Sequence, residues 1–483
     1  MPEWVLTHIS GQTPMLYVDG SGGLWVHTFQ NSKLYYKRHH STNWKEITLS
    51  PDQNLFNRVR DITEDQNGNI WIITSHLGAF ILKPGSEDIQ HFTNNPFQPQ
   101  TISSDNLNAI CSDKDGLVWL GSFKKGISYY SPQAQVFLSH NILPNSDVIS
   151  FLEDDKDIWM GTDGGGLLKL SDSGNDTYSV PVQANIIQTI KADKNGILWI
   201  GTYQNGIVKY DHGKTEHIHS NNSNLSSNIV YALQFDKEGM LWIATLNGNV
   251  QKMNTSSGNI ETAFQGNFNI RDLVYDGDHS LYAGTSSGLM RIDTQTGKHE
   301  MVKETKSFII ALCKDSKNNI WFGTANGLTY YNIDTRESKT LTTTDGLSSN
   351  SVTAIIEDNN QQLWVGTANG LNRLKWTGET YNIAKYYESD GIVSNTINER
   401  AIYKQKNGNL LIGTPNGYTI AIPQHIVSQN YHAQVHLTEL SSSVQSIWEK
   451  LHKSSMEQTD EISLPEGQTS AVARFSTLDF TNK

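Results

Sequence analysis

The sequence predicts an all-β protein built as a β-propeller, on the basis of two observations. A pattern of apolar run, polar turn, second apolar run and Gly-containing turn recurs along almost the whole chain, as from Ile355 to Leu374. Such alternation with short turns is typical of antiparallel strands joined by hairpins. The ten copies stand 39 to 48 residues apart, close to the length of a four-stranded propeller blade. The fold that we expect is one complete seven-bladed propeller, preceded by about three blades of another and followed by the start of a β-sandwich.

Each repeat is centred on an anchor residue, usually Trp, that is followed three positions later by Thr or Ser. The anchors are Trp25, Trp71, Trp119, Trp159, Trp199, Trp242, Tyr282, Trp321, Trp364 and Leu411. A residue at one place in every repeat most often packs between blades, so we interpret the anchors as structural rather than as sugar-stacking residues.

Two further positions repeat with the anchors. An Asp stands six residues before the anchor in eight repeats, as Asp358 does before Trp364, and it is predicted to open a polar turn by bonding the local backbone. In one repeat Asp154 stands five residues before, and in the last repeat Gln405 replaces the Asp. Gly follows the anchor by two in seven repeats, as at Gly161, which fits close approach by a neighbouring backbone.

Residues 1–132 hold the first three repeats and are predicted to form a partial propeller. The expected strands of the first repeat are Met15–Asp19, Leu24–Thr28, Lys33–Arg38 and one near Trp44–Leu49. The third repeat ends with a strand at Gly126–Tyr130.

Residues 133–425 hold the other seven anchors and are predicted to form the closed propeller. The last repeat has strands at Thr396–Tyr403, Leu410–Thr414 and Gly417–Ile422, but no obvious fourth strand. A propeller commonly completes its last blade with a strand from its other end, which removes an exposed edge. The lone strand Gln135–His140 is free for that role, so we expect it to become the outer strand of the last blade.

Residues 430–483 lack the blade pattern. Val435–Leu440, Glu461–Leu464 and Ala471–Phe475 read as strands, which are too few to close a β-sandwich. We interpret this segment as the truncated start of such a domain.

Composition limits the class of protein. The chain of 483 residues has a formal net charge of −12, which argues against direct binding of nucleic acid. No apolar run approaches the length of a membrane span, and the N-terminus lacks the pattern of a secretory signal. Cys111 and Cys313 occupy the same place in different repeats, so we expect them to be unpaired and to fill core positions.

The repeat Asn319–Leu328, with its copies and the Gly-Leu-Ser-Ser-Asn loop at 346–350, resembles the two-component regulator propeller repeat. That repeat builds the sensor region of hybrid two-component histidine kinases of gut Bacteroidetes, and the resemblance covers residues 14–422. The stretch from Asp460, with Phe475 and Leu478–Asn482, is similar to the start of the Tyr-rich β-sandwich of that family. This chain departs from the family by truncation, because the first propeller has three blades and the kinase, receiver and DNA-binding parts are absent.

The resemblance implies a non-enzymatic sensor on the periplasmic side of the inner membrane. It implies an oligosaccharide ligand and a homodimer in the full-length context, with membrane attachment only through segments absent from this chain. It implies no cofactor. The alternatives are a propeller enzyme, such as a virginiamycin B lyase-like or glycan-cleaving enzyme, and a structural interaction scaffold.

The loops that lead into the blades and those between second and third strands are expected to open on one face. Aromatic residues beside Arg or Lys there suit an oligosaccharide, through stacking and charge-assisted hydrogen bonds. The candidate ligand-binding residues are Asp163, Tyr203, Phe268, Arg271, Lys306, Phe308, Glu399 and Arg400. No catalytic residue and no metal ligand is predicted, because His217 and His219, and the adjacent His39 and His40, have no ligand cluster at metal spacing.

Overall fold

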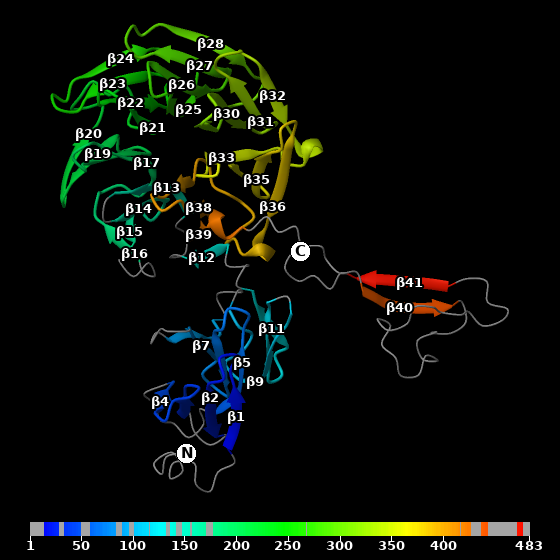
Figure 1. The fold of residues 1–483 in the computed structure, drawn as a ribbon. Helices are drawn as coiled ribbons and strands as arrows, with labels where there is room; N and C mark the ends of the chain where they lie inside the picture. The colour runs from blue at the N-terminus through cyan, green and yellow to red at the C-terminus, as the bar shows by residue number, and fades with distance from the viewer. Residues whose placement is uncertain are drawn as a thin grey trace. The chain divides into compact units, whose positions relative to one another are not determined.

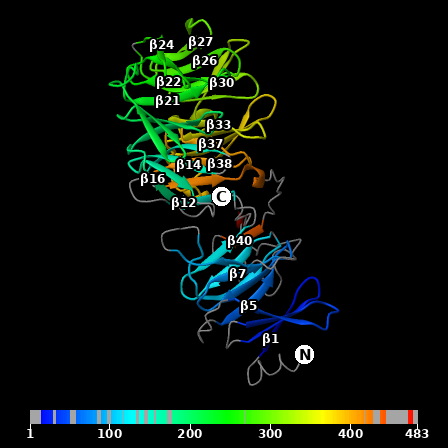
Figure 2. The same ribbon diagram turned by 90° about the vertical axis from the view of Figure 1, so that its left-hand side faces the viewer.

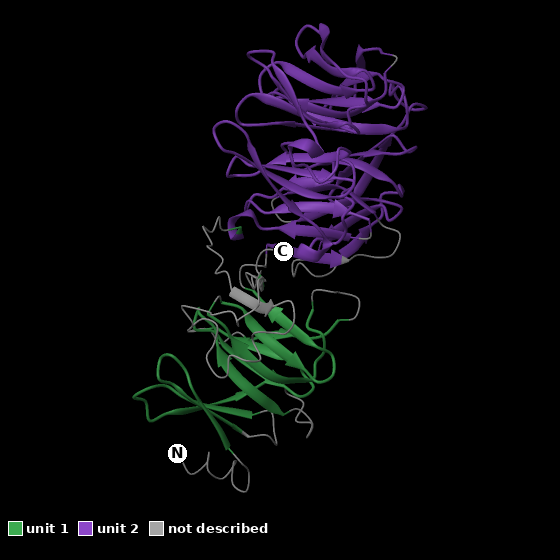
Figure 3. Cartoon of the chain, turned by 90° about the vertical axis from the view of Figure 1, so that its right-hand side faces the viewer, with its two compact units in different colours: residues 1–96, 101–134, 426–483 green, residues 97–100, 135–425 purple. Residues whose placement is uncertain are grey.

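The computed structural model is an all-β structure that divides into two compact units (Figure 3). Unit 1 comprises residues 1–96, 101–134 and 426–483, and unit 2 comprises residues 97–100 and 135–425. The structure describes residues 14–28, 33–49, 58–83, 89–95, 101–114, 116–131, 136–141, 147–154, 157–170, 177–266, 268–415, 417–426, 436–442 and 471–476. Within these ranges the only helices are the 3-10 turns η1 (Thr343–Asp345), η2 (Glu388–Asp390) and η3 (Pro423–His425). None of them could cross a membrane.

Unit 2 is a ring of seven four-stranded antiparallel blades (Figure 1). Blades 1 to 3 are β13 (Asp147–Glu153), β14 (Ile158–Asp163), β15 (Leu167–Leu170) and β16 (Thr177–Val180); β17 (Ile187–Ala192), β18 (Leu198–Thr202), β19 (Ile207–Asp211) and β20 (Lys214–Ile218); and β21 (Val230–Phe235), β22 (Met240–Thr245), β23 (Val250–Asn254) and β24 (Ile260–Phe264). Blades 4 to 6 are β25 (Ile270–Tyr275), β26 (Ser280–Thr285), β27 (Gly288–Asp293) and β28 (His299–Glu304); β29 (Ala311–Lys314), β30 (Asn319–Thr324), β31 (Gly327–Asn332) and β32 (Ser338–Leu341); and β33 (Val352–Glu357), β34 (Leu363–Thr367), β35 (Gly370–Trp376) and β36 (Tyr381–Tyr386). Blade 7 is β37 (Ile402–Lys404), β38 (Leu410–Thr414), β39 (Gly417–Ala421) and β12 (Phe137–Asn141).

The last blade is completed by a strand from the start of the unit, as the sequence predicts. Strand β12 pairs antiparallel with β39, with Leu138 opposite Ile420. The first strands of the seven blades contact one another in sequence, and that of blade 7 also contacts that of blade 1, so the ring is closed. The predicted strand Thr396–Tyr403 is wrong in its extent, because only residues 402–404 join the sheet. The backbone before it is held by blade 6 instead, since the Arg400 N–H donates to the Thr353 carbonyl at 2.8 Å.

The Gly two residues after the anchor is where one blade meets the next. A Cβ on Gly201 would stand 2.7 Å from Thr189 Cγ2 and 2.9 Å from Val230 Cγ1, and one on Gly323 would stand 2.5 Å from Val352 Cγ1. Val230 and Val352 are the first residues of the following blades. Close approach is therefore present, but among these glycines a neighbouring backbone supplies the nearest atom only at Gly413, where a Cβ would stand 2.3 Å from the Val148 carbonyl oxygen; at Gly201 and Gly323 the nearest atoms belong to side chains.

Each anchor Trp is tied to the Asp of its own turn. The Asp358 side chain accepts the Trp364 indole N–H at 2.9 Å through Oδ2, and the N–H groups of Asn360 and Gln362 through Oδ1. The same indole bond joins Asp19, Asp65, Asp113, Asp154, Asp193, Asp236 and Asp315 to their anchors. The predicted bond to the local backbone is present, and the indole bond is an addition that orients the anchor ring.

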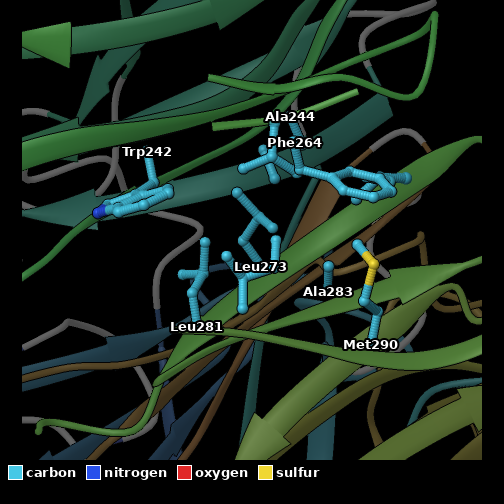
Figure 4. Packing of buried hydrophobic residues seen from close by; sticks show 11 residues of the cluster. Trp242, Ala244, Phe264, Leu273, Leu281, Ala283 and Met290 are labelled. Carbon is cyan, nitrogen blue, oxygen red and sulfur yellow. The ribbon is translucent and has the colours of Figure 1, made fainter. Parts of the chain in front are cut away.

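The apolar cores lie between neighbouring blades rather than inside a central body. Figure 4 shows the cluster between blades 3 and 4, where Trp242 and Phe264 from one blade pack against Leu273, Leu281 and Met290 from the next. Because each blade buries one face on each neighbour, the ring is stabilised by contacts between consecutive repeats.

Unit 1 holds three blades (Figure 2). They are β1 (Pro14–Val18), β2 (Leu24–Thr28), β3 (Lys33–Lys37) and β4 (Trp44–Thr48); β5 (Val59–Glu64), β6 (Ile70–Thr74), β7 (Ala79–Leu82) and β8 (Ile89–Phe92); and β9 (Leu107–Ser112), β10 (Val118–Ser122) and β11 (Ile127–Tyr130). A two-stranded sheet of β40 (His436–Ser442) and β41 (Ala471–Ser476) follows, whereas the predicted strand 461–464 lies outside the described residues.

The two cysteines are unpaired, as predicted, but they differ in burial. Cys313 is half-buried on β29 of the closed ring, whereas Cys111 is exposed on β9. The expectation of a core position is wrong for Cys111, because β9 belongs to the last blade of unit 1 and no further blade packs on it within the described ranges.

We expect Gly323→Ala to lower the free energy of unfolding of unit 2 by about 1–3 kcal/mol, because the new methyl group would overlap Val352. Gly121→Ala is the matched control, since its Cβ would meet nothing closer than Ala109 at 3.6 Å. Urea denaturation of both variants checks this. Equal stability changes for the two would contradict the account of blade contact.

We expect Asp358→Ala to lower the stability of unit 2 by at least about 1.5–3 kcal/mol, because three donors lose a charged acceptor. The comparison variant is Glu379→Ala, an exposed carboxylate in the same blade. Urea unfolding, monitored by Trp fluorescence, measures the stability of both variants. An unchanged free energy of unfolding for Asp358→Ala would show that the indole bond contributes nothing.

Candidate functional site at the propeller axis

The first strands of five blades contain a β-bulge at the same place. The register shifts at Ile149, Gln188, Tyr231, Arg271 and Thr353, each the second residue of its strand or the one after it. A bulge residue is left out of the ladder. In blades 2, 3 and 4 the bulge residue therefore has its side chain or its backbone carbonyl available to groups at the centre of the ring.

In blade 7, Arg400 occupies the place that the bulge residues occupy in those five blades. It stands one residue before Ala401, whose carbonyl accepts the N–H of Gly413, the glycine two residues after the anchor. Its guanidinium donates to the carbonyls of Tyr231, at 2.5 Å, and Arg271, at 2.7 Å. It also donates to Gln188 Oε1 at 3.0 Å. These acceptors belong to blades 3, 4 and 2, which lie two or three places round the ring from blade 7. Arg400 therefore reaches across the propeller axis and joins four blades.

Arg271 is held beside Arg400 by aromatic rings. Its guanidinium carbon lies 4.1 Å from the centre of the Tyr231 ring and 5.6 Å from that of Phe308. Contacts of this kind stabilise a cation through the negative face of the ring. Within the part of the chain that the structure describes, the Arg271 side chain makes no hydrogen bond to a protein acceptor, so its N–H groups remain available.

We call Gln188, Tyr231, Arg271, Phe308, Thr353 and Arg400 the axial site. These residues come from blades 2 to 7 or from the segments that lead into them. Tyr231 is buried, Phe308 and both arginines keep some accessible surface, and Thr353 is buried.

Charged groups surround the axial site. Burial raises the pKa of the Asp272 carboxyl, opposed by Arg400, by the Leu312 N–H at 2.8 Å and by Lys191. Burial likewise lowers the pKa of Lys191, opposed by Asp272, and lowers the pKa of Arg400, opposed by Asp272 and Glu399. Asp272, Lys191 and Arg400 all keep some accessible surface, yet the surrounding protein desolvates each charge. At the ring centre the Asp272 carboxylate thus faces two cations, Arg400 and Lys191.

The structure brings three of the eight predicted site residues together. Arg271, Phe308 and Arg400 meet at the axial site, and Glu399 is exposed beside Arg400. The structure gives Arg400 a structural role that the sequence did not predict, because its guanidinium is engaged by protein acceptors.

The other four predicted residues make no hydrogen bond, ion pair or ring contact with the axial site within the described ranges. Asp163 is exposed on β14, and Lys306 is exposed before β29. Tyr203 is half-buried and its N–H donates to the Ile186 carbonyl, while Phe268 packs against the core between blades 3 and 4. Sequence reasoning missed Gln188, Tyr231, Thr353, Asp272 and Lys191. Their shared signal is their place in the first strands, which the repeat alignment could have shown.

No group of His, Cys, Asp or Glu within the described ranges could hold a metal ion.

The repeats match a known family. Residues 55–76, 181–204, 224–247, 304–326 and 346–369 match the family model described as two component regulator propeller. One match lies in unit 1 and four lie in unit 2. Five segments of this chain are therefore similar to the two component regulator propeller repeat.

Similar proteins are longer than this chain. Histidine kinase P4 of Formosa agariphila is 26% identical over 520 residues, which span 89% of this chain and 37% of that protein. The extracellular domain of a protein described as a hybrid two-component system of B. thetaiotaomicron has a TM-score of 0.72 at 21% identity, covering 93% of this chain and 60% of that one. A second such extracellular domain from the same organism has a TM-score of 0.51 at 19% identity, covering 89% and 60%. This chain thus spans less than two thirds of these relatives.

A protein of a different class is similar in structure to part of this chain. Virginiamycin B lyase from Staphylococcus aureus has a TM-score of 0.50 at 14% identity, covering 59% of this chain and 99% of the lyase. At such identities these structures show the fold alone.

We expect Arg400→Ala to lower the stability of unit 2 by at least about 3 kcal/mol, because three acceptors from three blades lose a charged donor. The control is Arg291→Ala, which removes an arginine from the outer part of blade 4 that pairs with Glu300 near the surface. Thermal and urea unfolding of both variants check this. Equal losses would show that Arg400 does not join the blades.

Proposed function

We propose that this chain is a ligand-sensing region of a hybrid two-component sensor kinase and that it acts outside the cytoplasm, on the periplasmic side of the inner membrane. The repeat family and a relative named as a histidine kinase support the class. The structural likeness to extracellular domains of two-component proteins agrees with the compartment. In this proposal the kinase and the membrane attachment belong to regions not contained in this sequence, and the working unit is a homodimer.

We further propose that the ligand is an oligosaccharide and that the axial site binds it. The observation that carries this is Arg271, whose guanidinium lies against the rings of Tyr231 and Phe308 with no protein acceptor in the described ranges. A guanidinium fixed in this way is preorganised to donate several hydrogen bonds in one plane, which suits hydroxyl or carboxylate groups.

The position of the site gives a route for a signal. Arg400 joins blades 2, 3, 4 and 7, and its neighbour Arg271 is the residue offered to the ligand. A ligand that accepts hydrogen bonds from Arg271 changes the surroundings of the Arg400 guanidinium, which joins four blades. A ligand shifts the packing of the ring if it binds one arrangement of the blades more tightly than another. Contacts at the axis can supply that difference in affinity.

We expect the full chain to bind an oligosaccharide and to leave it unchanged. Calorimetry against a panel of neutral and acidic oligosaccharides measures binding, and chromatography of each ligand after incubation measures turnover. Formation of a product would contradict the sensor and favour a lyase or a glycan-cleaving enzyme. Failure of the whole panel to bind would contradict the oligosaccharide ligand.

A further inference from the structure

Two polar atoms at the axial site are buried without a hydrogen-bond partner. They are Nε of Arg400 and Oγ1 of Thr353. The two residues are adjacent in space, because the Arg400 N–H donates to the Thr353 carbonyl at 2.8 Å. Leaving a buried donor unpaired costs free energy, and a bound group that accepts its hydrogen bond would offset that cost.

Like charges also meet at this place. Burial lowers the pKa of Arg400, and the positive charge of Arg271 lowers it further. Arg400 also donates to the backbone carbonyl of Arg271, so two cationic residues are neighbours here. Lys191 is a third cation near the axis.

The negative groups that face this cluster are Asp272, which acts on Arg400 and Lys191, and Glu399, which is exposed to water. Three cations, Arg271, Arg400 and Lys191, therefore face two carboxylates, one of them exposed to water, so an excess of positive charge remains at the axis of a chain whose formal net charge is −12.

We propose that the axial site binds an anionic group of the ligand, a carboxylate or a sulfate ester, so that the oligosaccharide recognised is an acidic one. This inference rests on the proposed function, and it names the chemical class of its ligand. The free N–H groups of Arg271 and the Nε–H of Arg400 donate to the anion, and the Thr353 hydroxyl donates a further bond. The anion relieves the repulsion between the arginines and gives partners to both unpaired atoms.

The probes are matched pairs that differ in charge. Trigalacturonic acid and its methyl ester have the same sugar chain, and a sulfated galactan trimer is compared with its desulfated form. We expect the full chain to bind at least one acidic member about ten to a hundred times more tightly than its neutral counterpart, because hydrogen bonds to charged groups are the stronger ones. Preferential binding of trigalacturonic acid indicates a carboxylate ligand, and preferential binding of the sulfated galactan trimer indicates a sulfate ester. The preference should weaken as NaCl is raised.

Two variants test the residues. Arg271→Gln should lose about ten- to a hundredfold in affinity for the acidic probe and little for the neutral one. Thr353→Val keeps the shape of the side chain and removes the unpaired hydroxyl. It should lower the affinity for the acidic probe and leave the affinity for the neutral probe unchanged. Arg291→Gln, on the outer part of blade 4, is the control and should bind as the wild type does. Thermal unfolding of each variant shows that it is folded.

The outcomes separate the two proposals. Equal affinity for charged and neutral probes, or unchanged affinity of Arg271→Gln for an acidic probe, overturns this inference and leaves the oligosaccharide sensor standing. A chain that binds none of the probes overturns both.

Discussion

The structure of unit 2 depends on closure of the ring. Each blade buries its two faces only against its neighbours, so a gap anywhere would leave two apolar faces uncovered. Closure is achieved in two ways. The Gly residues after the anchors let the first residue of the next blade come close, and β12 adds the outer strand to blade 7. In unit 1 no further blade packs on β9–β11 within the residues that the structure describes, and Ile127 on that blade is 71% exposed.

A closed ring brings seven first strands together around one axis, and the polar groups there need partners. The β-bulges in five of these strands leave carbonyl groups outside the ladders, and Arg400 donates to two of them. One side chain therefore connects blades that are distant in the sequence and not adjacent in the ring. The same arrangement leaves Arg271 and two unpaired atoms at the axis, which is why we place ligand recognition there.

Much of the fold could be predicted from the sequence, because the strongest signals are local and repeated. The anchors, the Asp turns and the spacing gave the blades, and the missing strand after Ile422 pointed to β12. Burial of Cys111 was predicted wrongly, because a position within a repeat says nothing about whether a neighbouring blade is present. The site was predicted less well. Arg400 was predicted to contact ligand, which stays a prediction, whereas its protein partners come from three other blades and no local pattern shows them.

The measurement that tests the account most directly is the nuclear magnetic resonance of the arginine side chains in the full chain, labelled with nitrogen-15 at arginine. During titration with an acidic oligosaccharide that binds, we predict that the Nε–H signals of Arg271 and Arg400 shift together and saturate with the calorimetric affinity. The signal of Arg291, on the outer part of blade 4, should stay in place. Binding that leaves the signals of Arg271 and Arg400 unmoved would show that the ligand is recognised elsewhere and would contradict the axial site.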